Sequence, residues 1–226
     1  MNQGFVRAAT DVGGTFTDLV YYEYDVESQR FNTLKTAKVD TTPPDFERGV
    51  MIALRSADVA PDSIHFFAHG TTLVINAITE RKGVKVGLLT TQGFRDVLEV
   101  ARGNRPDLFN YSYVKPPPFV PRHLRKEISG RINYQGEVLQ PLKLDELSAV
   151  VDYFRNEQVD AIAICLLHSY VNPVHEVELA ETVRALWPEV DIVASHEITR
   201  EWREYERTNT VVLSAYIHPI ANRYLG

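Results

Sequence analysis

A ten-residue segment near the N-terminus, Ala9 to Asp18, most constrains what this chain can fold into. It reads ATDVGGTFTD and joins two apolar runs through a pair of glycines, with two aspartates and three threonines around them. A glycine pair between two apolar runs predicts a tight turn between antiparallel strands. An ordinary hairpin is one interpretation, but a turn alone does not require the acidic and hydroxyl residues, which favour a bound anion.

The chemistry of the segment is that of a phosphate-binding hairpin. Gly13 and Gly14 allow backbone dihedrals closed to other residues and let a bulky anion approach the peptide N–H groups. Thr15 and Thr17 offer hydroxyl donors to phosphate oxygens. We predict that these four residues and Asp18 bind the phosphates of a nucleotide.

Two carboxylates beside a phosphate require a cation. Asp11 and Asp18 would repel a bare phosphate, so the sequence predicts Mg²⁺ between them, and we assign Asp11 as the metal-binding and catalytic residue. The hairpin is not a phosphate loop of the Gly-x-x-x-x-Gly-Lys-Ser/Thr type. It has no lysine, and residues 16–25 continue as a strand-like run where that loop has a helix.

Composition excludes several classes of protein. The 226 residues, 44% hydrophobic and 24% charged, suit one large or two small globular domains. A net charge of -6 without a basic run argues against a nucleic-acid partner. The single cysteine, Cys165, excludes a disulfide framework and predicts a core residue. Because the sequence shows neither a leader nor a long apolar run, we expect a cytoplasmic protein that does not enter membranes.

The spacing of apolar residues predicts an α/β fold. Residues 5–10, 16–24 and 30–38 form a meander, and a helix follows Pro43-Pro44. Strands and helices then alternate, which indicates a sheet with parallel members and covering helices. The expected strands are 64–68, 84–90, 161–168 and 192–195, and the expected helices are 73–81, 94–101, 145–156 with Asp145 as N-cap, 173–186, and one from about 203 to the end.

A proline-rich segment divides this pattern. Residues 104–121 predict a long ordered loop, and residues 131–142 predict a β excursion that turns at Gln135-Gly136. We therefore expect three parts, 1–103, 104–142 and 143–226. The last helix reaches the final residue with no later element on which to pack, so we expect that the chain is cut off from a longer fold.

A second candidate site follows the strand at 64–68. Gly70 permits a tight turn, and Thr71 and Thr72 would stand at a helix N-terminus, where free N–H groups attract anions. We predict His69 as a catalytic residue, and Thr71, Thr72 and Asn76 as substrate-binding residues. The alternative, equally compatible with the sequence, is that a threonine caps the helix and His69 is a hydrogen-bonded core residue.

Further charged groups have two interpretations each. Arg102, Asn104 and Arg105 precede most of the prolines and could clamp a carboxylate or phosphate in fork geometry, with Arg105 predicted to bind substrate, but surface ion pairing is the alternative. The charged run 201–207 suits either a solvated helix face or a site. Four histidines of the second half lack the spacing of a helical metal pair: His168, His175, His196 and His218.

The motifs together resemble a known family. The hairpin from Asp11 to Asp18 resembles the first phosphate loop of the actin-like ATPase superfamily, which includes sugar kinases and chaperone ATPases. Three further segments narrow the resemblance to the N-terminal region of the hydantoinase A/oxoprolinase family. They are residues 69–83, which begin HGTT, residues 91–107, which begin TQGFRD, and residues 195–207, which begin SHEI.

The resemblance implies an actin-like (ribonuclease H-like) ATPase half-fold with a mixed sheet. It implies ATP and Mg²⁺ as cofactors, and hydrolysis of a cyclic amide (a hydantoin, 5-oxoproline or another lactam) through a phosphorylated intermediate. Carboxylation of acetone or acetophenone is the alternative in the same family, and a non-catalytic assembly module is a third possibility. A sugar or acetate kinase relative shares the hairpin but leaves residues 69–72 unexplained.

The implied partners follow from the family's length. Family proteins continue for several hundred residues beyond the matching region, and that part normally supplies the second phosphate loop and the adenosine contacts. We therefore expect a missing C-terminal half and a hydantoinase B-type subunit as partners, and little or no ATP hydrolysis by this chain alone.

Overall fold

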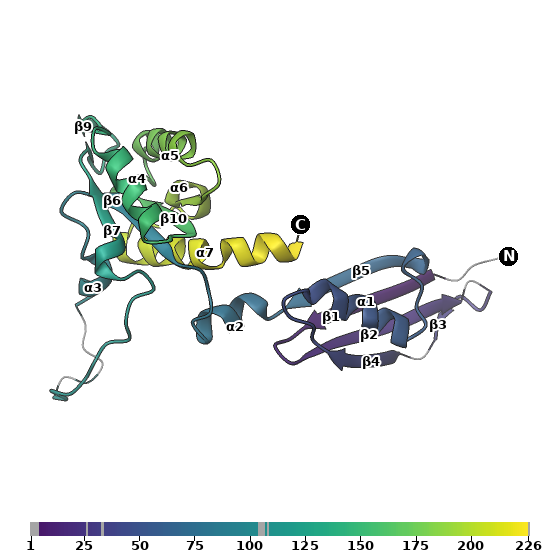
Figure 1. Cartoon of the computed structure of the whole chain (residues 1–226). Helices are drawn as coiled ribbons and strands as arrows, with labels where there is room; N and C mark the ends of the chain where they lie inside the picture. Colours follow the sequence, from purple (N-terminus) through teal and green to yellow (C-terminus); the bar gives the residue numbers. More distant parts are fainter. Residues whose placement is uncertain (1–4, 26, 33, 104–106, 108, 226) are drawn as a thin grey trace. The chain divides into compact units, whose positions relative to one another are not determined.

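The structure is a computed structural model that describes residues 5–25, 27–32, 34–103, 107 and 109–225 (Figure 1). The chain forms two compact units, of which unit 1 is Met1–Lys82 with Ala221–Gly226 and unit 2 is Gly83–Ile220. This division differs from the expected boundaries at 103 and 143. The reason is that the strand directly after Gly83 pairs with strands of the second half of the chain.

Unit 1 is built on a five-stranded mixed sheet. Its order is β3-β2-β1-β5, and β4 also pairs with β2. All pairs that involve β2 are antiparallel, whereas β1 and β5 are parallel. The predicted meander and mixed sheet are confirmed. The strands are β1 (Phe5–Val12), β2 (Phe16–Asp25), β3 (Arg30–Phe31), β4 (Lys35–Asp40) and β5 (Ile64–Thr71).

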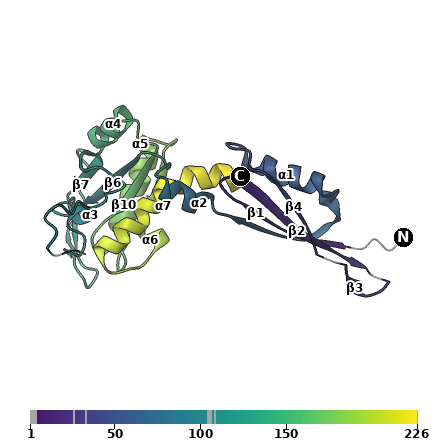
Figure 2. The same cartoon turned by 90° about the horizontal axis from the view of Figure 1, so that it is seen from below.

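One face of this sheet carries the core of unit 1. Along β1, burial alternates strictly, with Val6, Ala8, Thr10 and Val12 buried and the residues between them exposed, as a strand with one covered face requires. Helix α1 (Phe46–Ser56) supplies Val50, Ala53 and Leu54 to the same core at helical spacing. Figure 2 shows α1 lying over the strands. The residues of β1 that face away from α1 include Asp11.

The remaining elements of unit 1 are short. A 3-10 turn, η1 (Pro61–Ser63), leads into β5, and α2 (Leu73–Thr79) follows it. The last residues of the chain, at the end of α7, cluster with this unit.

Unit 2 is built on a four-stranded parallel sheet with the order β11-β10-β6-β7. A separate antiparallel pair, β8 with β9, forms the β excursion predicted at residues 131–142. The strands are β6 (Val86–Thr91), β7 (Arg125–Ile128), β8 (Arg131–Ile132), β9 (Val138–Gln140), β10 (Ala161–Cys165) and β11 (Asp191–Ala194). The helices are α3 (Val97–Val100), η2 (Arg122–Leu124), α4 (Leu147–Asn156), α5 (Val174–Leu186), α6 (Ser195–Ile198) and α7 (Glu204–Leu225).

The sheet of unit 2 is buried on both faces. Every residue of β6 and β10 is buried, as parallel strands covered by helices on both sides should be. Gly87 of β6 is required by packing, because a Cβ there would lie 2.9 Å from Cζ of Phe154 on α4. Cys165 is a free, buried core residue as predicted, and burial raises the pKa of its thiol.

Several element ends differ from the prediction. Helix α4 begins two residues later than expected, at Leu147, with Glu146 at the N-cap position and no side-chain cap, so the assignment of Asp145 as N-cap is wrong. Strand β10 ends at Cys165 instead of His168, because His168 turns the chain with a φ of 61°. The predicted helix at 94–101 is a single turn, which ends where Ala101 adopts a φ of 51°. None of the helices in the described parts combines the length and apolarity that a bilayer crossing requires.

Candidate functional site

The glycine pair forms the predicted turn between two strands of unit 1. Strand β1 ends at Val12, β2 begins at Phe16, and Gly13 N donates to Phe16 O at 2.9 Å across the turn. Beyond the turn the two strands pair antiparallel, with Asp11 opposite Asp18. The two carboxylates predicted to flank a cation therefore stand directly across from each other.

Gly13 and Gly14 allow neighbouring atoms to approach the backbone closely, and they do not adopt left-handed dihedrals. Neither Gly13 nor Gly14 is among the glycines with φ in the left-handed range, which are Gly93, Gly103, Gly130 and Gly136. A Cβ at Gly13 would lie 3.0 Å from Phe16 O, and one at Gly14 would lie 3.1 Å from Asn76 Nδ2. The dihedral argument made from the sequence is thus corrected, while the argument from backbone access is retained.

The two predicted hydroxyl donors lie in different environments. Thr15 is exposed at the turn, so its hydroxyl is available to a phosphate oxygen. Thr17 is 0% exposed, its Oγ1 is 3.3 Å from that of Thr41, and it lies against Gly49 of α1. Because strand residues alternate in facing, Thr17 points into the core while its neighbour Asp18 faces the other way. We therefore leave Thr17 out of the candidate phosphate-binding group.

Asp11 is the carboxylate best placed to hold a cation. Asp18 forms an ion pair with Lys38, whose Nζ lies 3.0 Å from Asp18 Oδ1. Asp11 forms no ion pair within the described residues. Its Oδ1 lies 3.6 Å from where a Cβ of Gly70 would stand, so the glycine on the neighbouring strand leaves room beside the carboxylate.

These residues fit Mg²⁺. That ion keeps several waters and takes one or two carboxylates together with substrate phosphates, and an exposed Asp11 beside an open turn matches this requirement. Within the described parts of the chain, no three His, Cys, Asp or Glu side chains gather into a larger metal site.

The second predicted motif lies beside the first. Strand β5 pairs with β1 in parallel register, so that His69, Gly70 and Thr71 stand next to Thr10, Asp11 and Val12. The two motifs come together although 59 residues separate Thr10 from His69.

The same register places His69 on the core face of the sheet, opposite the face of Asp11. A hydrogen bond of 2.7 Å joins His69 Nδ1 to the hydroxyl of Thr10, which is 4% exposed. The other ring nitrogen, Nε2, is hydrogen-bonded to the hydroxyl of Tyr224. Both nitrogens are therefore hydrogen-bonded, as the alternative interpretation of His69 expects, although the residue is exposed and so is not part of the core. We leave it out of the candidate catalytic group.

The threonines that follow differ from each other. Thr71 Oγ1 donates to Val12 O and accepts from Leu73 N, both at 3.1 Å, so its hydroxyl joins β5 to the start of α2. Thr71 is therefore engaged within the protein one residue before the N-cap of α2, which is Thr72 and makes no side-chain cap hydrogen bond. In contrast, Thr72 Oγ1 accepts from Asn76 Nδ2 at 3.2 Å, and that amide borders Gly14. Thr72 and Asn76 therefore stand beside the turn, where a bound phosphate would meet them.

The predicted arginines belong to unit 2. Asn104 and Arg105 lie outside the described residues, so their assignments stay predictions. Arg102 Nε is hydrogen-bonded to Glu206 Oε1. This ion pair agrees with the alternative reading of Arg102 as a surface residue.

Two residues that the sequence did not reveal complete the site. Thr41 follows β4, and its hydroxyl donates to Gly13 O at 2.9 Å, while its N donates to Thr15 O at 2.9 Å. Thr41 thus fixes the turn on both sides of Gly14. Tyr224 comes from the end of α7; burial raises its pKa, and the charges of Glu47 and Asp11 add to this, while the interaction with the Thr71 hydroxyl opposes it.

Only for Thr41 did the sequence hold a signal. It lies in the pair Thr41-Thr42 just after a predicted strand of the meander, close in sequence to the hairpin. Tyr224 is 155 residues from His69, and no local pattern reveals such a contact.

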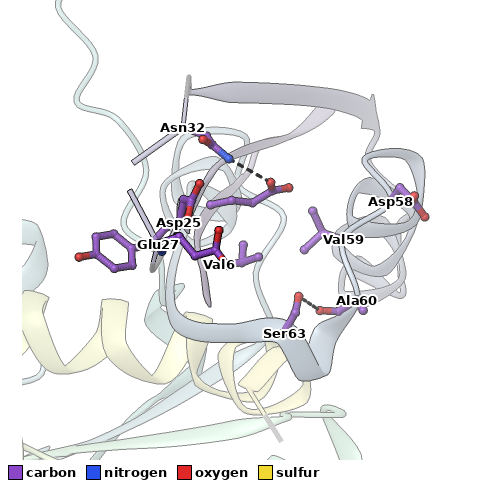
Figure 3. A pocket seen from close by; sticks show the side chains of 10 residues that line it. Val6, Asp25, Glu27, Asn32, Asp58, Val59, Ala60 and Ser63 are labelled. Carbon is purple, nitrogen blue, oxygen red and sulfur yellow. Dashed lines mark hydrogen bonds between the residues drawn. The ribbon is translucent and has the colours of Figure 1, made fainter. Parts of the chain in front are cut away.

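A pocket of unit 1 lies at the other end of the hairpin. It has a volume of about 500 Å³, and Figure 3 shows acidic side chains such as Asp25, Glu27 and Asp58 along it. Val6, which lines it, is five residues from Asp11 on β1, roughly 17 Å along the strand. No lysine or arginine is among its lining residues in the described part, so it does not suit an anion.

Known proteins share this architecture. The solved structure of an ATP-dependent caprolactamase from Pseudomonas jessenii matches with a TM-score of 0.79 and 36% identity over 97% of this chain and 32% of that one. A nucleotide-free acetone carboxylase structure matches with a TM-score of 0.85 over 98% of this chain and 33% of that one. At 24% identity, the second match shows the shared fold alone. The fold is therefore that of the N-terminal region of these ATP-dependent enzymes.

Sequence comparison identifies the family. The family model of the hydantoinase/oxoprolinase N-terminal region matches residues 7–187 of this chain. The chain belongs to the hydantoinase/oxoprolinase family, and the resemblance inferred from its motifs is confirmed.

Two curated relatives illustrate the range of the family. The caprolactamase subunit alpha of Pseudomonas jessenii is 37% identical over 100% of this chain and 33% of its own length. The acetophenone carboxylase gamma subunit of Aromatoleum aromaticum is 32% identical over 96% of this chain and 31% of its own length. The chain thus spans about a third of the length of the curated relatives that it matches.

Proposed function

We propose that this chain supplies the phosphate-binding part of an ATP-dependent enzyme that hydrolyses a cyclic amide. The observation that carries the proposal is the exposed Asp11, which has no ion pair within the described residues and stands at an open glycine turn. The identity with a caprolactamase subunit supports a lactam-type substrate.

Each residue of the turn has a proposed role. Asp11 holds Mg²⁺ through water, and the backbone at Gly13 and Gly14 approaches the phosphates. Thr15 donates its hydroxyl to a phosphate oxygen, and Lys38 neutralises Asp18 so that only one carboxylate faces the ion. Mg²⁺, when bound, neutralises the charge that develops on the transferred phosphoryl group.

Thr72 and Asn76 are proposed to bind the transferred phosphate or the substrate. They stand beside Gly14, where Asn76 Nδ2 would lie 3.1 Å from a Cβ at that glycine. An amide is a poor electrophile, and phosphorylation of its oxygen would create a good leaving group before water attacks. The side-chain amide of Asn76 is a neutral donor, suited to an oxygen that gains negative charge.

A ketone carboxylase is the second candidate. The identity with an acetophenone carboxylase gamma subunit supports it, and the same hairpin would place a γ-phosphate against a different oxygen nucleophile. The relatives are named as subunits alpha, beta and gamma, which supports the proposal that this chain works with further subunits, including one of hydantoinase B type. We propose that turnover needs those parts.

The proposal is tested by calorimetric titration of ATP into the chain with Mg²⁺ and with EDTA. Asp11→Asn should weaken Mg²⁺-ATP binding tenfold or more and should not weaken Mg²⁺-free binding, because it removes the cation contact together with a carboxylate that repels a bare phosphate. Asp25→Asn is the matched control. It changes the same charge on the same hairpin, beside the acidic pocket, and should behave as the unaltered chain.

Three results would contradict the proposal or a part of it. Equal Mg²⁺ dependence of binding in the Asp11→Asn and Asp25→Asn variants would show that Asp11 does not hold the ion. Tight association with a partner subunit without any ATP binding would favour the assembly module. Turnover of ATP with a hydantoin or lactam at ordinary enzymatic rates by the chain alone would refute the need for further parts.

A further inference from the structure

The parallel sheet of unit 2 has a topological switch point at its carboxyl edge. From β6 the chain goes to β7 on one side, and it later returns to β10 on the other side. In open α/β sheets, ligands bind outside the carboxyl ends of the strands at such a point. The segments that leave the two strands are joined there, because Leu167 N donates to Thr91 Oγ1 at 2.9 Å.

Two buried charged residues fix the chain as it leaves β10. Leu166 N donates to Glu176 Oε1 at 2.7 Å, and Leu166 O accepts from Arg207 Nη2 at 2.7 Å. Glu176 is 0% and Arg207 1% exposed. Two residues after Leu166, His168 adopts a φ of 61°. That conformation is uncommon for residues other than glycine and persists only where its surroundings impose it.

Buried polar atoms at this edge have no protein partner. Among the described residues, Arg207 Nε and His168 Nδ1 are buried without a hydrogen bond. The two Nη atoms of Arg207 donate to backbone carbonyls, those of Glu201 at 3.0 Å and of Leu166, and the guanidinium also interacts with the thiol of Cys165. Buried polar groups are nearly always hydrogen-bonded, so each exception calls for an explanation. A ligand at the edge supplies one.

The charges at this edge favour an anion. Arg131 stands just beyond β7 with its guanidinium 5.2 Å from the ring centroid of Phe94, and it forms no ion pair within the described part of the chain. Burial lowers the pKa of His168, and the positive charges of Arg131 and Arg207 lower it further, against the opposing effect of Glu204. The charges of two arginines and one carboxylate therefore act on the imidazole of His168.

The space beside Arg207 is small. A cavity of about 10 Å³, lined by residues that include Phe94, Glu204 and Arg207, has room for one water-sized group. One oxygen of an anion that rests on the surface beside Arg131 would fill it.

We propose that Arg131, His168 and Arg207 bind a small oxyanion, a carboxylate or a phosphate, at the carboxyl edge of the unit 2 sheet. Arg131 supplies charge and a fork of N–H donors, Arg207 supplies the unpartnered Nε, and the imidazole of His168 supplies a neutral hydrogen-bonding group. Tyr170 orients both Arg207 and His168. The centroid of its ring lies 5.4 Å from the Arg207 guanidinium and 5.9 Å from the centroid of the His168 ring. None of these residues belongs to the hairpin of the proposed phosphate site.

The test follows the imidazole signals of His168 by NMR in the isotope-labelled full chain. The signals are assigned by their loss in His168→Asn, since asparagine tolerates the left-handed backbone conformation. Sodium phosphate and sodium acetate are titrated separately at constant ionic strength. A saturable shift with one of them supports the site and identifies the class of anion, and a saturable shift with neither overturns it.

Arginine variants add a matched comparison. Arg131→Gln should weaken binding of the anion at least tenfold. Arg131→Lys keeps the charge but loses the fork of N–H donors, so its affinity for the anion should lie between those of Arg131→Gln and the unaltered chain. Arg155→Gln is the control, because Arg155 also lies over an aromatic ring, 5.1 Å from Trp187, but on α4. It should bind within twofold of the unaltered chain. Equal losses in Arg131→Gln and Arg155→Gln would overturn the proposal.

Discussion

The turn of unit 1 and the carboxyl edge of unit 2 use polar residues in opposite ways. At the turn, Asp11, Gly14 and Thr15 are exposed, and the contact that braces them comes from Thr41. At the edge, Glu176 is fully buried and accepts four hydrogen bonds, from Leu166 N, Ser195 Oγ, and both N and Nδ1 of His196. The exposed groups of the turn remain available to a ligand. The buried hydrogen bonds of Glu176 instead fix the backbone at Leu166, next to the residues proposed to bind the anion.

The largest expected effect breaks the buried network. Glu176→Ala should lower the free energy of unfolding of the chain by about 3–5 kcal/mol, because it leaves buried donors without their acceptor. Urea unfolding followed by circular dichroism measures the loss. Glu178→Ala, an exposed change on the same helix, should stay within about 0.5 kcal/mol of the unaltered chain. Similar losses in both variants would show that the network does not stabilise unit 2.

The next effect concerns access to the turn. Gly14→Ala should weaken Mg²⁺-ATP binding about tenfold, equal to about 1.4 kcal/mol, because a methyl group occupies the approach of the phosphates. Its Cβ would also lie 3.1 Å from Asn76 Nδ2. The double variant Gly14→Ala/Asn76→Ala, compared with Asn76→Ala alone, separates the two causes. If Gly14→Ala costs no affinity in the Asn76→Ala background, contact with Asn76 is responsible, and obstruction of the nucleotide is then excluded.

A smaller effect tests the brace of the turn. Thr41→Val removes the hydrogen bond from its hydroxyl to Gly13 O, which should cost about 1 kcal/mol of stability and a few-fold in Mg²⁺-ATP affinity. Thermal unfolding and calorimetry measure the two effects. Thr36→Val on the exposed part of β4 is the control. Unchanged affinity in Thr41→Val would show that the turn keeps its shape without the brace.

The smallest effect is a pH dependence within unit 2. The hydrogen bond with Glu176 raises the pKa of His196 above its ordinary value of 6.5, against the effect of burial. A raised pKa means that the pair stabilises the folded state fully below pH 6.5, and that this stabilisation is lost as pH rises through the folded pKa. His196→Asn keeps a donor near Nδ1 but does not titrate.

Urea unfolding between pH 5.5 and 8.5 compares the two chains. The stability of the unaltered chain relative to His196→Asn should fall as pH rises. Taking the difference removes the opposite dependence that His168 and His175 contribute, since burial lowers the pKa of both. Parallel curves would contradict the predicted coupling of His196 to Glu176.

The sequence predicted the local features of the candidate site. The glycine pair of the turn, the antiparallel meander and the excursion at Gln135-Gly136 follow from turn residues and alternating apolar positions, and all are present. The sequence also indicated the family, because four motifs occur in a fixed order. The roles of Asp11, Thr72 and Asn76 stay predictions that the experiments above test.

The facing of side chains could not be predicted. His69 lies on the core face and Asp11 on the other because β5 pairs with β1 in one register, and a shift by one residue would exchange these faces. Thr17 is buried because α1 places Gly49 against it. Register and helix placement depend on contacts distant in sequence, which no local pattern reports.

The sequence by itself determined the α/β class, the glycine turn with its acidic and hydroxyl residues, and the family, because these depend on local propensity and on motif order. Tertiary structure alone decided that two units divide at Gly83, that Thr41 braces the turn, and that Glu176 and Arg207 hold the peptide before His168. The physical reason is that a hydrogen bond between distant residues forms only where packing of the core brings donor and acceptor together.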